Sequence, residues 1–166
     1  MRSYRSAAVV TTVVITAATT WSLAQAGSAH AVGGNNLSFF IHDTKQVQLD
    51  LNTKGDQGDS FVFHGLTYDK KGGAKIGRFG GSCAILEAAG GAPADWSCNV
   101  DYILPGGQLN TEIFGDPGVL FNGKPFAFSV LGGTGKYSDA RGAGIMSIPT
   151  NVKDQADGYV KLHIVG

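Results

Sequence analysis

The stretch FAFSVLGGTGKYSDARGAGIMSI, residues Phe126 to Ile148, decides the fold because it joins two apolar runs through a glycine-rich turn. In the first run, large apolar residues recur at every second position, the period that is typical of a β-strand. Gly132, Gly133 and Gly135 then interrupt this pattern, and a second apolar run follows. The stretch therefore predicts a β-hairpin.

A strand followed by Gly-Gly-Thr-Gly is also how a dinucleotide-binding unit begins, where glycines let the backbone approach a pyrophosphate at a helix N-terminus. The residues that follow exclude this alternative. The third glycine of G-x-G-x-x-G falls on Ser138, and Gly142, Gly144 and Pro149 leave no room for an amphipathic helix. We therefore predict no nucleotide site here.

Short apolar runs separated by turn signals fill most of the remaining chain. The predicted strands are Leu37–His42 continuing into Gln46–Leu51, Ser60–Tyr68, Lys75–Leu86, Trp96–Leu104, Gln108–Phe114, Pro125–Leu131, Ala143–Ile148 and Gly158–Val165. No helical segment of convincing length, internal repeat or linker interrupts them. About eight short strands with abundant glycine favour one all-β domain, a sandwich or a barrel.

Residues 1–31 have the features of a secretory signal peptide. Arg2 and Arg5 give a positive start, an apolar run follows, and Ala29-His30-Ala31 fits the small-x-small cleavage rule. An anchoring helix is the weaker alternative because the apolar run is short and carries threonines. We expect a secreted protein whose single domain covers residues 32–166 and which has no membrane contact after cleavage.

The charge of this domain excludes strongly charged partners. Removing Arg2 and Arg5 from the 13 basic residues leaves 11, against 13 acidic residues. A slightly acidic chain with scattered lysines has no electrostatic footprint for nucleic acid or an anionic membrane. A small, apolar or aromatic molecule is the better candidate for a ligand.

The two cysteines are predicted to form a disulfide. Cys83 and Cys98 lie in strand-like runs on either side of Gly90-Gly91, and a hairpin folded there pairs residues whose numbers sum to 181. That register places Cys83 directly opposite Cys98, within reach of a bridge, and export favours oxidation. A metal or catalytic role is less favoured because the spacing is not C-x-x-C.

Two segments carry a family resemblance. Gly132 to Gly142 resembles G-G-T-G-x-Y/F-x-x-A-R-G, the signature turn of the dirigent proteins, which are similar in fold to the allene oxide cyclases. Leu37 to Asp43 resembles the F-Y/F-x-H-D first strand of the same family. The resemblance implies a single antiparallel eight-stranded β-barrel, a calycin-like architecture, and selects the barrel over the sandwich.

The resemblance also suggests two catalytic residues. Asp43 shares the parity of Phe39 and Ile41 and is expected to point into the barrel, where the family uses this aspartate as an acid/base group. A turn-capping role is the alternative. Arg141 matches the family's A-R-G arginine, which can bind an anionic oxygen, although a structural ion pair would also explain it. We expect both side chains to line one pocket. Lys136 stands where plant dirigent proteins often have aspartate, which argues against the plant coupling reaction.

The barrel interior is expected to be apolar, although the hairpin of Cys83 leaves open which of its faces is the lumen. Aromatic residues expected to contact a ligand there are Phe39, Phe63, Tyr102, Phe128 and Tyr137, unless they only fill the core. Three histidines, His42, His64 and His163, fall on neighbouring predicted strands and would suit a metal. Isolated histidines are more often satisfied groups, so we predict no metal and no cofactor.

Two functions fit these expectations. One is a cofactor-free barrel that steers a cyclisation or stereoselective coupling of an apolar or aromatic substrate. The other is a non-catalytic secreted ligand-binding or surface protein, since a fold does not fix a function; a carbohydrate-binding module is weaker. Apolar residues on both parities of Ser60–Tyr68 also predict a homo-oligomer, possibly a homotrimer by resemblance.

Overall fold

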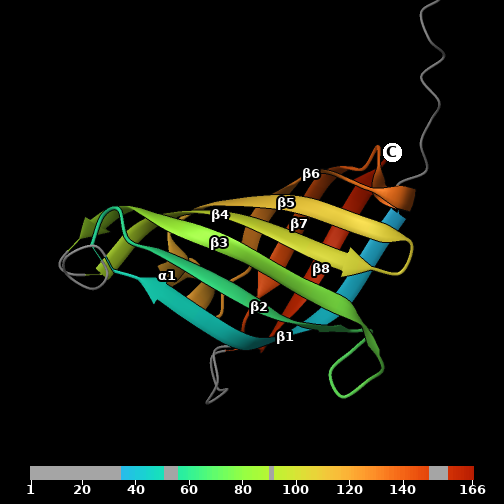
Figure 1. The fold of residues 1–166 in the computed structure, drawn as a ribbon, viewed down its shortest axis with the longest axis horizontal. Helices are drawn as coiled ribbons and strands as arrows, with labels where there is room; N and C mark the ends of the chain where they lie inside the picture. The colour runs from blue at the N-terminus through green and yellow to red at the C-terminus, as the bar shows by residue number, and fades with distance from the viewer. Residues whose placement is uncertain (1–34, 51–55, 90–91, 150–156) are drawn as a thin grey trace, which may run out of the picture. The chain divides into compact units, whose positions relative to one another are not determined.

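The computed structural model describes residues 35–50, 56–89, 92–149 and 157–166. Eight strands make up this part of the chain (Figure 1): β1 (Asn35–Leu49), β2 (Ser60–Tyr68), β3 (Lys75–Ala89), β4 (Ala92–Leu104), β5 (Gly107–Gly115), β6 (Phe126–Gly133), β7 (Arg141–Ser147) and β8 (Asp157–Val165). The predicted signal peptide lies outside the described residues.

The strands form a closed antiparallel barrel in chain order. Each strand pairs with the next, and β8 pairs with β1 to close the sheet. Each of the eight described strands therefore has a neighbour on both sides, which is how closed barrels avoid edge-to-edge association. The predicted all-β, eight-stranded barrel is confirmed, and the predicted strands coincide with the observed ones to within a few residues.

Two local features differ from the prediction. β1 runs without a break through residues 43–45, where a β-bulge replaces the expected interruption. The predicted turn after β5 contains a short helix, α1 (Pro117–Phe121), which begins because the Asp116 carboxylate accepts a hydrogen bond of 2.7 Å from the Gly118 N–H. In the part of the chain that the structure describes, no helix is long and apolar enough to cross a membrane.

The interior is the apolar face of each strand. In the β3–β4 hairpin, Phe79, Cys83, Val100 and Tyr102 are buried, whereas Arg78, Asn99 and Asp101 are exposed on the outer wall. Burial of each large apolar side chain stabilises the fold by about 1.5–3 kcal/mol. The expected apolar lumen is thus confirmed, and the polar set of the hairpin faces outward.

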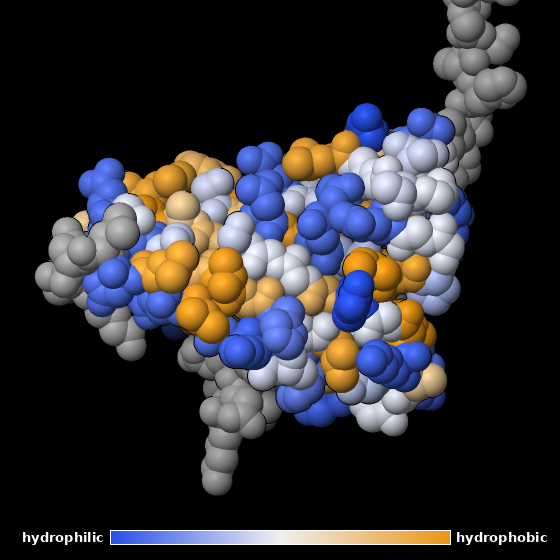
Figure 2. Space-filling view, in the orientation of Figure 1, coloured by the Kyte–Doolittle hydropathy of each residue, from blue (hydrophilic) through white to orange (hydrophobic). Residues whose placement is uncertain are grey.

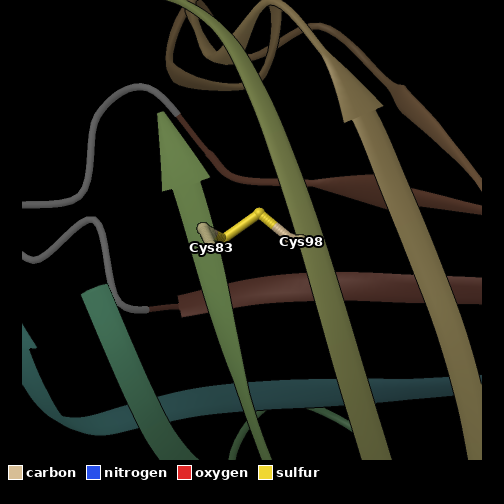
Figure 3. Close-up of a disulfide and its surroundings, with 2 residues drawn as sticks. All are labelled: Cys83 and Cys98. Carbon is tan, nitrogen blue, oxygen red and sulfur yellow. A yellow bond between two sulfur atoms is a disulfide. The ribbon is translucent and has the colours of Figure 1, made fainter. Parts of the chain in front are cut away.

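The predicted disulfide is present. Cys83 and Cys98 are direct partners in the β3–β4 register and are bonded to each other (Figure 3). Both side chains are almost completely buried inside the barrel. The bridge closes a loop of 15 residues, for which the chain-entropy model gives about 3 kcal/mol of stabilisation.

The glycine-rich turn after β6 closes one end of the barrel. It contains a 3-10 turn, η1 (Gly135–Tyr137), and folds over the β4–β5 turn, where the Thr134 N–H donates to the Gln108 carbonyl at 2.8 Å. A side chain at Gly133 would collide with that same carbonyl, and Gly135 has a φ of +61° that favours glycine. The Tyr137 ring is buried beneath the turn, so this end of the barrel is plugged.

Candidate functional site

A cavity of about 770 Å³ lies inside the barrel, towards the end that carries α1. This end is opposite the plugged one, because α1 connects the end of β5 to the start of β6. The strands that begin or end near α1 contribute residues to the cavity lining. Pro117, Leu120 and Phe121 of α1 form part of the wall. A cavity of this size suits one small organic molecule.

Aromatic rings line one side of the cavity in an unbroken series. Trp96 is in edge contact with Phe121 and with Phe61, at centroid distances of 5.5 and 4.9 Å. The series continues through Phe63 and Phe79 to Tyr102, with neighbouring centroids about 6 Å apart. Such rings offer a flat apolar surface on which another aromatic or conjugated molecule can stack.

The residues predicted to contact a ligand divide into two groups. Phe63 and Tyr102 line the cavity. Phe39, Phe128 and Tyr137 do not line the cavity but belong to the buried core cluster. Contact of these three residues with a ligand stays a prediction.

Asp43 lines the cavity near its mouth, as predicted. Burial raises the pKa of its carboxyl, and the Lys45 N–H, which donates to Oδ1 at 3.2 Å, offsets part of this rise, as do nearby His64 and His42. The bond to Lys45 is the turn-capping contact that the alternative interpretation expected. The two roles coexist, and a raised pKa makes the carboxyl better suited to donate a proton near neutral pH.

A bulge in β1 begins directly after Asp43. Asp43 pairs with Gly65 and Lys45 with His64, so Thr44 is an extra residue without a partner across the strand. The Thr44 hydroxyl donates to the His64 carbonyl and lies 3.0 Å from His64 Nδ1. Because the hydroxyl proton is already donated, Nδ1 must be the donor in the second bond. Sequence reasoning missed this bulge, since an inserted threonine leaves no distinctive signal.

A second carboxylate stands at the cavity mouth. Asp157 lines the cavity, and its Oδ1 lies 2.6 Å from His42 Nδ1 across the β1–β8 pairing that closes the barrel. Sequence reasoning missed Asp157 because its neighbour is 115 residues away and is brought close only by closure. The pair joins the first and last strands beside Asp43.

The three histidines are not gathered at one point. His42 contacts Asp157, His64 contacts Thr44, and His163 Nδ1 lies 3.0 Å from the side-chain oxygen of Asn36. Within the described ranges, no group of three or more His, Cys, Asp or Glu side chains is placed to hold a metal ion. Each histidine has a protein partner, as the satisfied-group interpretation expected.

Arg141 lies at the other end of the barrel from Asp43. It opens β7 opposite Val165, the last residue of β8, whereas Asp157 beside Asp43 is the first residue of β8. Eight residues of β-strand separate these positions by about 26 Å. The guanidinium donates to the Ala140 carbonyl at 2.6 Å and does not line the cavity. The prediction that Asp43 and Arg141 share a pocket is therefore wrong.

No family model and no curated protein matches this chain. Solved structures do match. A pyocyanin demethylase superposes with a TM-score of 0.65 at 20% identity, over 79% of this chain and 100% of its own. A pterocarpan synthase dirigent protein superposes with a TM-score of 0.59 at 15% identity, over 80% and 93%. The chain has the dirigent-type barrel fold.

A third barrel among the matches is a nonspecific heme-binding cyclase that is described as catalysing a 4 + 2 cycloaddition during neoabyssomicin biosynthesis. It superposes with a TM-score of 0.65 at 17% identity, over 81% of this chain and 67% of its own. Because all three sequence identities are low, these similarities establish the fold of the barrel alone. Its chemistry has to be inferred from the residues that line the cavity.

Proposed function

We propose that this dirigent-type barrel binds an apolar or aromatic small molecule in its cavity and steers its cyclisation or stereoselective coupling without a cofactor. The observation that carries the proposal is the placement of Asp43, a carboxyl of raised pKa, at the rim of a cavity walled by aromatic rings. The rings would hold the substrate, and the carboxyl would exchange a proton with it.

The chemistry follows from confinement. Ring closure in solution is slow in large part because a flexible substrate must give up conformational entropy to reach the reactive geometry. A cavity that binds the substrate in that folded geometry removes this cost from the chemical step. An apolar wall also excludes water from reactive intermediates. Asp43 would then protonate, or accept a proton from, the atom that changes charge during the reaction. Arg141 has no part in this scheme because it lies outside the cavity.

The similar structures support this class of reaction. One is described as catalysing a 4 + 2 cycloaddition, another as an exo-specific intermolecular Diels-Alderase, and others as pterocarpan synthase dirigent proteins. The barrel of this chain has the same fold and contains a cavity whose lining is mostly apolar.

The proposed setting is outside the cell. The disulfide between Cys83 and Cys98 supports an oxidising compartment, where such bridges form and persist. The signal features of residues 1–31 support it too. Thiol mapping of protein recovered from culture medium tests this part: both cysteines bridged is the expected result, and an intracellular, reduced protein would contradict it.

The test of function compares Asp43→Asn with the matched control Asp139→Asn, an exposed aspartate near the plugged end. Each variant is incubated with phenolics, oxidised fatty acids and polyketide-like polyenes, and products are followed by mass spectrometry. We expect conversion or stereocontrol to be lost in Asp43→Asn and kept in the control. Ligand binding with no conversion by the wild-type protein would favour the non-catalytic binding protein instead.

A further inference from the structure

We propose that the Tyr102 hydroxyl is a second polar contact for the substrate and donates a hydrogen bond to a neutral acceptor oxygen, such as a ketone carbonyl. The proposal rests on the proposed function, because it assigns the group that the same cavity would recognise. It starts from a row of residues that the strand register places side by side.

Asp43 and Tyr102 belong to one row across four adjacent strands. Asp43 of β1 pairs with Gly65 of β2, Gly65 with Phe79 of β3, and Phe79 with Tyr102 of β4. Paired residues on adjacent strands point to the same face of a sheet. All the side chains of this row therefore face the barrel interior, with a carboxyl at one end and a phenol at the other.

The middle of the row is a flat apolar platform. Gly65 leaves space that the Phe79 ring fills, since a Cβ at Gly65 would collide with that ring and with the His42 carbonyl. The Phe79 ring stacks on Tyr102 with an interplanar angle of 29° and a centroid distance of 6.0 Å. The Phe39 ring packs edge-on against the Tyr102 ring, with the centroids 5.1 Å apart. These contacts fix the direction of the phenol.

The Tyr102 hydroxyl is free to donate a hydrogen bond to a ligand. Tyr102 lines the cavity although only 1% of the residue is exposed, and its hydroxyl forms no hydrogen bond with any described residue. Burial raises the pKa of this phenol, so it stays protonated. Among the described residues, the buried side-chain polar atoms that lack a partner are Thr67 Oγ1 and Trp96 Nε1. The Tyr102 oxygen is not one of them, so it is accessible from the cavity and can donate to an acceptor on a bound ligand.

The charges around the cavity define the acceptor. The charged side chains that line it are Asp43, Lys45 and Asp157, all on the mouth-side parts of β1 and β8. A carboxylate or phenolate placed at Tyr102 would therefore be buried without a cation, which is costly. A carbonyl oxygen carries no such penalty. Three strand spacings separate the Asp43 and Tyr102 backbones, about 14 Å along the wall.

The experiment uses two probes of equal shape, 9-fluorenone and fluorene, which differ in the carbonyl. The protein is the full chain with Trp21→Phe, so that Trp96 in the cavity wall is the remaining tryptophan and reports binding by its fluorescence. We expect about tenfold tighter binding of fluorenone, which corresponds to about 1.4 kcal/mol. In Tyr102→Phe the two affinities should become equal, with that for fluorene unchanged.

Tyr159→Phe is the matched control, because Tyr159 lies on the outer wall and is 41% exposed. It should keep the preference for fluorenone, and fluorene-9-carboxylate should bind most weakly to every variant. Equal affinities of fluorenone and fluorene for the unsubstituted cavity would overturn the hydrogen bond while leaving the binding cavity intact. Failure of all three probes to bind would overturn the proposed function together with it.

Discussion

Asp43 illustrates how one residue obtains its chemistry from its surroundings. Ile41 and Asp43 both line the cavity, and the bond from the Lys45 N–H fixes the orientation of the Asp43 carboxyl. Burial is the largest influence on its pKa and raises it, which means that the folded protein disfavours the ionised form. The burial that would prepare the Asp43 carboxyl for proton transfer therefore also makes the folded protein less stable when this carboxyl is ionised.

The sign of this effect gives a prediction for Asp43→Asn. Because the folded pKa lies above the ordinary value of 3.8, the folded state binds the proton more tightly than the unfolded state. The wild-type protein therefore loses stability as the pH rises through the folded pKa. We expect Asp43→Asn to be slightly more stable than the wild type at neutral pH, and this advantage to disappear below the unfolded pKa. Urea unfolding of both proteins at neutral pH and at a pH below the unfolded pKa measures this difference in stability. An Asp43→Asn variant that is less stable than the wild type at neutral pH would contradict the prediction.

At the scale of elements, the bulge in β1 connects the fold to the site. Before the bulge, the odd-numbered residues Ile41 and Asp43 face inward; after it, Gln46 is opposite Phe63 and Val47 is exposed opposite Val62. An extra residue in one strand is a common way to redirect a side chain next to an active site. The hydroxyl of Thr44 holds the bulge to β2 through two contacts with His64.

Thr44→Val tests this role because it removes the hydroxyl and keeps the shape of the side chain. We expect the free energy of unfolding to fall by about 1 kcal/mol, the usual net value of a lost hydrogen bond. We also expect the pH dependence of any Asp43-dependent conversion to shift, since His64 and Lys45 adjoin that carboxyl. Thr44→Ser keeps the hydroxyl and should retain both properties. A pH profile unchanged in Thr44→Val would show that the bulge does not depend on this hydroxyl.

At the scale of the whole barrel, the two ends have different tasks. The conspicuous Gly-Gly-Thr-Gly turn, with Tyr137 beneath it, closes one end, while the cavity opens at the other. Strand positions, the apolar face and the Cys83–Cys98 pairing were predictable because alternation and hairpin registers are local patterns. The separation of Asp43 from Arg141 was not predictable, because the end at which each residue lies depends on how all eight strands close.

The outer wall leads to a prediction about assembly. Val47, Leu49, Val62 and Phe114 lie on the outside of β1, β2 and β5 and are 42%, 54%, 43% and 65% exposed. Figure 2 shows apolar patches among polar residues on the face that includes these strands. Exposed apolar area of this kind often marks an interface. We expect a homo-oligomer, with a trimer as the first candidate, by light scattering at micromolar concentration; Phe114→Ser should weaken it, and a wild-type monomer would contradict it.

The most direct test of the proposed binding cavity is to locate a bound aromatic molecule by NMR. Amide shifts of the ¹⁵N-labelled full chain are recorded while 9-fluorenone is added. We expect the shifts to concentrate on cavity residues such as Asp43, Phe63, Val100 and Tyr102. Residues 132–142 of the plugged end should stay unchanged, in the wild type and in Arg141→Gln alike. Shifts concentrated on the glycine-rich turn and Arg141, with the cavity unaffected, would contradict it.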